Sequence, residues 1–92
     1  MSKRIGVIGI IIEDPKSAAH RVNTILSQYG HLITGRMGIP NHKENVGVIA
    51  LIIEGNTDEV GALTGKLGNL PGVTVKSALT AKTIEKGENL HD

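Results

Sequence analysis

Apolar residues along this chain follow two different spacings, and their alternation predicts strands and helices in turn. Segments rich in isoleucine and valine, either continuously apolar or alternating with polar residues, are typical of strands. They lie at residues 4–13, 31–40, 46–54 and 73–81. Two stretches between them repeat apolar residues every three or four positions, which is typical of amphipathic helices. The first extends from Asp14 and Pro15 to Gly30, and the second begins at Asn56 or Thr57 and ends in the run Gly-Asn-Leu-Pro-Gly.

Both predicted helices begin with residues that favour a helix N-terminus. Asp14 can cap the first helix and Pro15 fits its first turn, while Asn56 or Thr57 can cap the second. A free helix N-terminus also binds anions. Because the Asp14 carboxylate would occupy some of these amides, a plain cap is favoured over a phosphate pocket at the first helix.

The order strand, helix, strand, strand, helix, strand is the βαββαβ pattern of the ferredoxin-like α+β fold. It predicts a four-stranded antiparallel sheet with two helices on one face. Right-handed crossovers place residues 4–13 and 46–54 at the centre of the sheet. These two strands are also the continuously apolar ones, as central strands should be.

The other two strands are predicted as edges because their apolar residues alternate with polar ones. In the first of them, Ile33, Met37 and Ile39 alternate with Thr34 and Arg36. This alternation predicts a half-buried strand whose three apolar side chains share one face.

Both central strands are apolar on both of their faces, although one face should be polar in a monomer whose helices cover the other. The alternation leaves open which set of residues meets the helices. We assign Val7, Ile11, Val48 and Ile52 to the set that the helices leave uncovered.

Leaving this uncovered set in water would forgo about 1.5–3 kcal/mol per side chain. We therefore expect a homo-oligomer, a dimer or a tetramer, in which a second copy covers the face. The C-terminal tail is the less favoured cover, because it offers only Ile84 and Leu90.

The segment from Gly61 to Gly68, Gly-Ala-Leu-Thr-Gly-Lys-Leu-Gly, has some features of a phosphate-binding loop. That loop requires four residues between its glycines, a Ser or Thr after its lysine, and a position ahead of a helix. Here three residues separate Gly61 from Gly65, Leu67 follows the lysine, and the glycines lie within the predicted helix. We predict instead that Gly61 and Gly65 allow close packing, against the sheet or against a neighbouring subunit.

Composition favours one small domain at residues 1–81, followed by a loose polar tail at residues 82–92. The chain has 92 residues, no cysteine and one aromatic residue. Its net charge of +1 comes from ten basic and nine acidic residues spread along the chain, which argues against direct binding to nucleic acid. No segment approaches the roughly 20 apolar residues of a membrane span, so we expect a cytoplasmic protein without membrane contact.

No group of residues with a catalytic pattern can be recognised, so we expect a non-enzymatic protein without a cofactor. His20, His31, His42 and His91 form no pair with metal-binding spacing, and no cysteine accompanies them. We therefore predict no metal site. A nickel or zinc site between subunits, using His20 or His31, is the less favoured alternative.

Three segments resemble the small ACT-like proteins assigned to regulation of the iron-only hydrogenase system. The segments are RIGVIGIIIED, GRMGIP and GALTGKLGNLPGVTVKSALT, and the resemblance covers about residues 3–81. It implies a ferredoxin-like ACT domain, related in shape to the regulatory domain of nickel-responsive repressors, and an oligomer built through its sheets.

The resemblance also implies where a ligand would bind. ACT domains commonly bind small effectors, often amino acids, at subunit interfaces near the first strand–helix turn. Here that turn carries Glu13, Asp14, Lys16 and Ser17. The chain lacks both the metal-binding histidines of a nickel regulator and an appended DNA-binding module, so any control of transcription would act through a partner.

Two functions follow as hypotheses. The first is a regulatory module that acts as a homo-oligomer and senses a small ligand. The alternative is an assembly or interaction protein for hydrogenase biogenesis that binds no small ligand. The expected partners are copies of the chain itself, a small-molecule effector, and a separate regulator or hydrogenase-maturation protein.

Overall fold

The computed structural model describes residues 3–39 and 45–80, and these contain the predicted strands and helices in the predicted order. The elements are β1 (Arg4–Ile12), α1 (Pro15–Gln28), the 3-10 helix η1 (Gly30–Leu32), β2 (Ile33–Ile39), β3 (Gly47–Gly55), α2 (Thr57–Gly68) and β4 (Val73–Leu79). Only η1 was not predicted. The predicted tail lies outside the described residues, and no described helix is long and apolar enough to cross a membrane.

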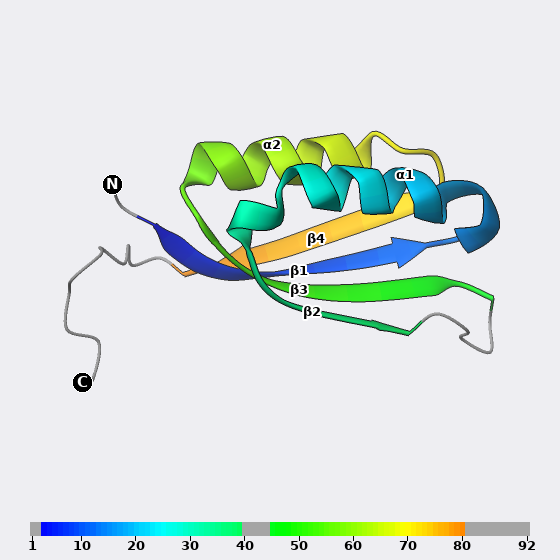
Figure 1. Cartoon of the computed structure of the whole chain (residues 1–92), viewed down its shortest axis with the longest axis horizontal. Helices are drawn as coiled ribbons and strands as arrows, with labels where there is room; N and C mark the ends of the chain where they lie inside the picture. The colour runs from blue at the N-terminus through cyan, green and yellow to red at the C-terminus, as the bar shows by residue number, and fades with distance from the viewer. Residues whose placement is uncertain (1–2, 40–44, 81–92) are drawn as a thin grey trace.

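The four strands form one antiparallel sheet in the order β2-β3-β1-β4, so β1 and β3 are central, as predicted. Figure 1 shows α1 and α2 next to each other on one face of this sheet. Helix α1 connects β1 to β2, and α2 connects β3 to β4; in both cases another strand lies between the two connected strands in the sheet. Right-handed crossovers of this kind bring both helices to the same face. Neither α1 nor α2 lies on the opposite face.

The core lies between the helices and one face of the sheet, and it shows which face of the central strands is buried. The buried strand residues are Ile8, Ile10 and Ile12 of β1 and Ile49, Leu51 and Ile53 of β3. The helices contribute Ala18, Val22 and Leu26 from α1 and Val60, Leu63 and Leu67 from α2. The residues assigned to the uncovered set therefore lie on the other face of these strands.

The two helices begin differently, although both starts were predicted to have a side-chain cap. At α2, the Asn56 side chain accepts a hydrogen bond from the Glu59 backbone amide at 2.8 Å, and the Glu59 carboxylate accepts one from the Asn56 amide at 3.1 Å. This capping box satisfies two amides that the helix cannot satisfy itself. At α1, the Asp14 side chain makes no cap hydrogen bond, so its predicted role is wrong. Its backbone carbonyl instead accepts from the amides of Ser17 and Ala18.

A β-bulge in β2 overturns the prediction that Ile33, Met37 and Ile39 share one face. The pairing with β3 shifts between Ile33 and Gly35, because these residues pair with the adjacent residues Ile53 and Ile52. An extra residue in one strand inverts the faces of everything that follows. Ile33 therefore packs against the core, while Met37 and Ile39 are exposed on the opposite face.

Gly6 marks the closest approach of β4 to β1, because a Cβ at this position would collide with the Leu79 side chain and lie 2.7 Å from the Ala78 carbonyl oxygen. We expect Gly6→Ala to lower the free energy of unfolding by about 1–3 kcal/mol, as overpacking does. Chemical denaturation followed by circular dichroism measures this change.

Gly38→Ala is the matched control on the same face of the sheet. A Cβ on Gly38 would lie 3.6 Å from the Val48 carbonyl oxygen and 3.8 Å from Ile49, which are ordinary contacts. We expect its effect on the free energy of unfolding to stay below about 1 kcal/mol. Equal destabilisation by both substitutions would contradict the tight contact at Gly6.

Candidate functional site

The sheet face opposite the helices carries large apolar side chains from three strands. Val7 and Ile11 of β1, Ile52 of β3, and Met37 and Ile39 of β2 expose between 39% and 72% of their surface. We call this surface the open face. The strand registers align its residues in three rows: Gly35, Ile52, Val7 and Ala78; Met37, Ala50, Gly9 and Lys76; Ile39, Val48, Ile11 and Thr74.

The middle row of the open face is low at the centre of the sheet, where Ala50 and Gly9 occupy β3 and β1. A Cβ added at Gly9 would have no atom within 4 Å. The rows on either side are higher, because they carry isoleucine and valine on these strands. A shallow trough at Ala50 and Gly9 therefore lies at the centre of the open face between two apolar ridges, with Met37 and Lys76 at its ends.

The residues predicted for an interface all lie on the open face. Val7, Ile11 and Ile52 are exposed, and Val48 is half-buried. Sequence reasoning missed Met37 and Ile39, because the bulge that turns them to this face leaves no mark in the simple alternation of apolar and polar residues.

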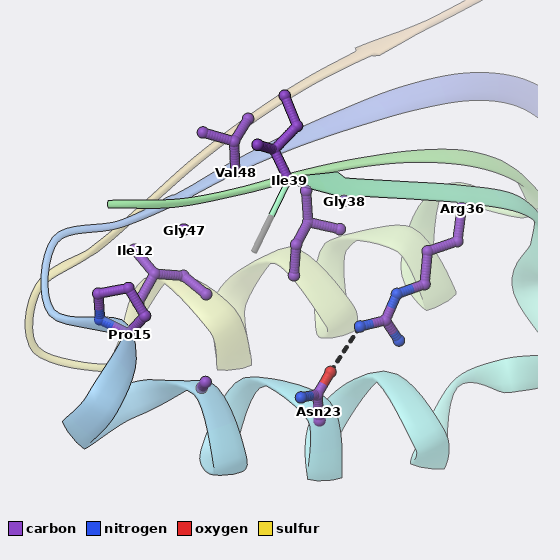
Figure 2. Close-up of a pocket in the computed structure, with 10 residues that line it drawn as sticks. Ile12, Pro15, Asn23, Arg36, Gly38, Ile39, Gly47 and Val48 are labelled. Atoms are coloured by element: carbon purple, nitrogen blue, oxygen red, sulfur yellow. Dashed lines mark hydrogen bonds between the residues drawn. The ribbon is translucent and has the colours of Figure 1, made fainter. Parts of the chain in front are cut away.

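A cavity of about 250 Å³ lies beside the open face, between α1, the second half of β2 and the beginning of β3 (Figure 2). Its walls are mostly apolar and include Ile12, Pro15, Ala19 and Ile49. The cavity exists because the chain places small residues where α1 passes over the edge of the sheet.

Two glycines keep this corner of the core open. Gly38 of β2 and Gly47 of β3 both lie on the helix-facing side, and neither provides a side chain to fill the space below α1. A Cβ on Gly47 would lie 3.4 Å from Ile12 and 3.6 Å from Pro15, which are ordinary contacts.

The polar side chains of the cavity come from Arg36 and Asn23. Arg36 extends from β2 toward α1, where its Nη2 donates a hydrogen bond of 2.6 Å to Asn23 Oδ1 (Figure 2). No carboxylate forms an ion pair with Arg36 within residues 3–39 and 45–80. The guanidinium is thus held in place by a neutral amide, and its charge is not neutralised by a described side chain.

The residues predicted to bind a ligand do not line this cavity. Glu13 and Asp14 lie on the turn between β1 and α1, Lys16 and Ser17 lie in the first turn of α1, and all four are exposed. The Ser17 hydroxyl donates to the Asp14 carbonyl at 3.2 Å, and the Glu13 amide donates to the Gly72 carbonyl at 2.8 Å. The turn nevertheless borders the cavity, because the adjacent residues Ile12 and Pro15 line it.

Sequence reasoning also missed Arg36 and Asn23 as cavity residues. Arg36 was taken for the polar side of β2, but the bulge turns it toward the helices, where it pairs in register with the buried Leu51. No local pattern of residues signals this reversal.

The histidines do not form a metal site in the part of the chain that the structure describes. No three histidine, aspartate or glutamate side chains come together there. His31 lies 3.6 Å from the Glu59 carboxylate, and its ring stacks near Tyr29, so it connects η1 to α2. His42 and His91 lie outside the described residues.

Gly61 and Gly65 do not approach the sheet. A Cβ at either position would meet nothing within 4 Å, and both residues are exposed on α2. The prediction of close packing against the sheet is therefore wrong. Close packing against a neighbouring subunit stays a prediction.

Comparison with known proteins identifies both a matching family and similar structures. Residues 4–77 match the family described as "TM1266-like: Iron-only hydrogenase system regulator, putative". The structure of the uncharacterized protein TM1266 from Thermotoga maritima is 38% identical and superposes with a TM-score of 0.79, covering 84% of this chain and 96% of that one. A comparison with curated proteins found no match.

More distant structures share the fold alone. The ACT domain of GTP pyrophosphokinase from Chlorobium tepidum is 22% identical, with a TM-score of 0.64 and coverage of 87% of this chain and 89% of that domain. The apo form of CPII from Thiomonas intermedia, a nitrogen regulatory PII-like protein, is 14% identical, with a TM-score of 0.52 and coverage of 89% and 95%.

Substitution of the α2 glycines tests whether a neighbouring subunit approaches them. If this side of α2 faces water, Gly61→Ala and Gly65→Ala should each raise the free energy of unfolding by roughly 0.5–1 kcal/mol, since alanine loses less backbone entropy in a helix. Thermal unfolding at several protein concentrations measures the effect. Destabilisation that disappears on dilution would instead indicate subunit packing at these positions.

Gly55→Ala serves as the control with the opposite expected sign. A Cβ on Gly55 would lie 2.9 Å from the Leu32 side chain within the same chain. It should destabilise the protein at every concentration.

Proposed function

Because this chain belongs to the family of TM1266-like iron-only hydrogenase system regulators, we propose that it serves this system as a small regulatory module that assembles with copies of itself and binds a small effector. The open face is the observation that carries the proposal. The cavity beside it supports the binding of an effector. Self-association and effector binding have separate tests.

Covering the open face would remove a large apolar surface from water. Val7, Ile39 and Ile52 each expose about half of their surface. Full burial of such a side chain stabilises by about 1.5–3 kcal/mol. Burying the half that is still exposed would therefore stabilise the assembly by roughly 1 kcal/mol per residue. In a two-fold symmetric dimer each residue counts twice, because both copies present the same patch.

The relief of the open face supports a second copy of the same sheet as the cover. Sheets that pack face to face interlock their side chains, with strands inclined by about 30° or 90°. The trough at Gly9 and Ala50 can receive an apolar ridge from a partner, while the apolar ridges of this copy enter the partner's trough. Lys76 and Thr74 lie at the β4 side, where they would form a polar rim.

The cavity shares a boundary with the open face. Ile39 and Val48 border the cavity and also belong to the third row of the open face. A ligand in the cavity would therefore act on residues that a second copy covers. Such a shared boundary allows a ligand to favour one assembly, provided that its affinity differs between the assembled and free chains.

Self-association is tested by changing the open face. We expect the chain to form a dimer or tetramer, and Ile52→Glu to raise the dissociation constant at least 100-fold, because a buried unpaired charge would replace apolar contacts on both copies. Light scattering coupled to size-exclusion chromatography measures molar mass over a range of concentrations.

Ala62→Glu is the matched control, because Ala62 is exposed on α2, away from the open face. It should leave the molar mass of the assembly unchanged. A wild-type chain that stays a monomer at high concentration would contradict the proposed assembly.

Effector binding is tested by thermal unfolding with a panel of amino acids, carboxylic acids, nucleotides and divalent metals. A specific ligand at 100 times its dissociation constant should stabilise the protein by about 2.7 kcal/mol, which corresponds to a rise in melting temperature on the order of 10 °C. Its effect on molar mass shows whether binding and assembly are linked. An intact oligomer that responds to no compound would support the non-sensing assembly protein instead.

A further inference from the structure

We propose that the cavity between α1 and β2 binds a small aliphatic monocarboxylate, with Arg36 holding the carboxylate and the apolar walls holding the hydrocarbon. This inference rests on the proposed effector binding and names its chemical class. It stands on three features of the cavity as the described residues form it: a cation that no described carboxylate pairs with, apolar walls, and no described side-chain acceptor left for a second charge.

The cation favours an anionic group at the opening of the cavity. A guanidinium has five N–H donors in a planar fork that matches a carboxylate. Arg36 donates one of these hydrogen bonds to Asn23, and this bond of 2.6 Å orients the guanidinium without neutralising its charge. The remaining donors are available to two carboxylate oxygens, because no described carboxylate pairs with Arg36.

The walls favour a short hydrocarbon behind this carboxylate. Ile12, Pro15, Ala19 and Ile49 provide aliphatic surface and no polar side-chain atom. The volume of about 250 Å³ exceeds the roughly 150 Å³ of an engineered cavity that holds benzene. It is smaller than the roughly 300–1,000 Å³ of pockets for drug-sized ligands. A branched acid of about five or six carbons fits this range, whereas a nucleotide does not.

The acceptors of the cavity distinguish a monocarboxylate from an amino acid. An α-ammonium group needs an acceptor, and burying it without one is costly. Among the residues that the structure describes, no aspartate or glutamate lines the cavity, and the one side-chain carbonyl there, that of Asn23, already accepts from Arg36. The site thus favours the acid without an ammonium group over the matching zwitterion.

Isothermal titration of the full-length chain with 3-methylbutanoate tests this inference. Leucine and 3-methylbutylamine are the comparison probes, since they add an ammonium group or replace the carboxylate. We expect 3-methylbutanoate to bind at least tenfold more tightly than leucine, and the amine to show no binding. Tighter binding of leucine, or no binding of 3-methylbutanoate at millimolar concentration, would overturn the assignment.

Variants locate the site within the chain. Arg36→Gln should weaken 3-methylbutanoate binding at least tenfold, while Arg21→Gln, on the exposed surface of α1 away from the cavity, should change it less than twofold. Gly38→Val should abolish binding by filling the cavity. Amide NMR spectra check that each variant is folded, and unchanged affinity in folded Arg36→Gln or Gly38→Val would refute the site.

The Ile52→Glu variant separates this inference from the proposed assembly. Ile52 does not line the cavity, and all lining residues belong to one chain. 3-Methylbutanoate should therefore still bind this variant, even if the wild-type chain proves to be a monomer, and any change in its affinity would measure the coupling between binding and assembly. Loss of binding in the variant would contradict a site contained in one chain, whatever its state of assembly.

Discussion

Large aliphatic side chains on both faces of β1 and β3 are the constraint on which the rest of the structure depends. One set meets α1 and α2 and forms a dry core, in which Ile8, Ile10 and Leu51 are fully buried. Neither α1 nor α2 meets the other set, because both crossovers have the same hand and bring both of these helices to one face. The same composition that stabilises the domain thus produces the open face, and our proposal of self-association follows from it.

Glycines give this small aliphatic domain its finer shape, and they act in different ways. Gly6 lets β4 come close to β1, and Gly72 takes the left-handed conformation, with φ of 72°, in the turn before β4. Gly9 lowers the middle of the open face. Gly38 and Gly47 instead withhold side chains below α1, so that a cavity remains where a larger residue would have completed the core. A domain without phenylalanine or tryptophan has little bulk with which to fill such a space.

The family and the geometry contribute different parts of the functional picture. Membership in the TM1266-like family places the chain with the iron-only hydrogenase system, and the ACT and PII-like structures share its fold. Neither identifies a ligand. The pairing of an oriented, unneutralised Arg36 with aliphatic walls supports a carboxylate ligand on chemical grounds. Ile39 and Val48 connect that cavity with the open face, so binding and assembly have a physical route by which they could be coupled.

The sequence alone determined the order of the elements, the central position of β1 and β3, and the excess of apolar surface, because these depend on local periodicity and on the hand of the crossovers. It located Val7 and Ile11 on one side of β1 and Ile52 on one side of β3, but it did not decide that the helices leave those sides open. Only the tertiary structure decided this, together with the bulge in β2 that turns Met37 outward and Arg36 inward. Pairing between strands sets which residues lie opposite each other, and a shift of one residue reverses the faces without changing the local sequence pattern.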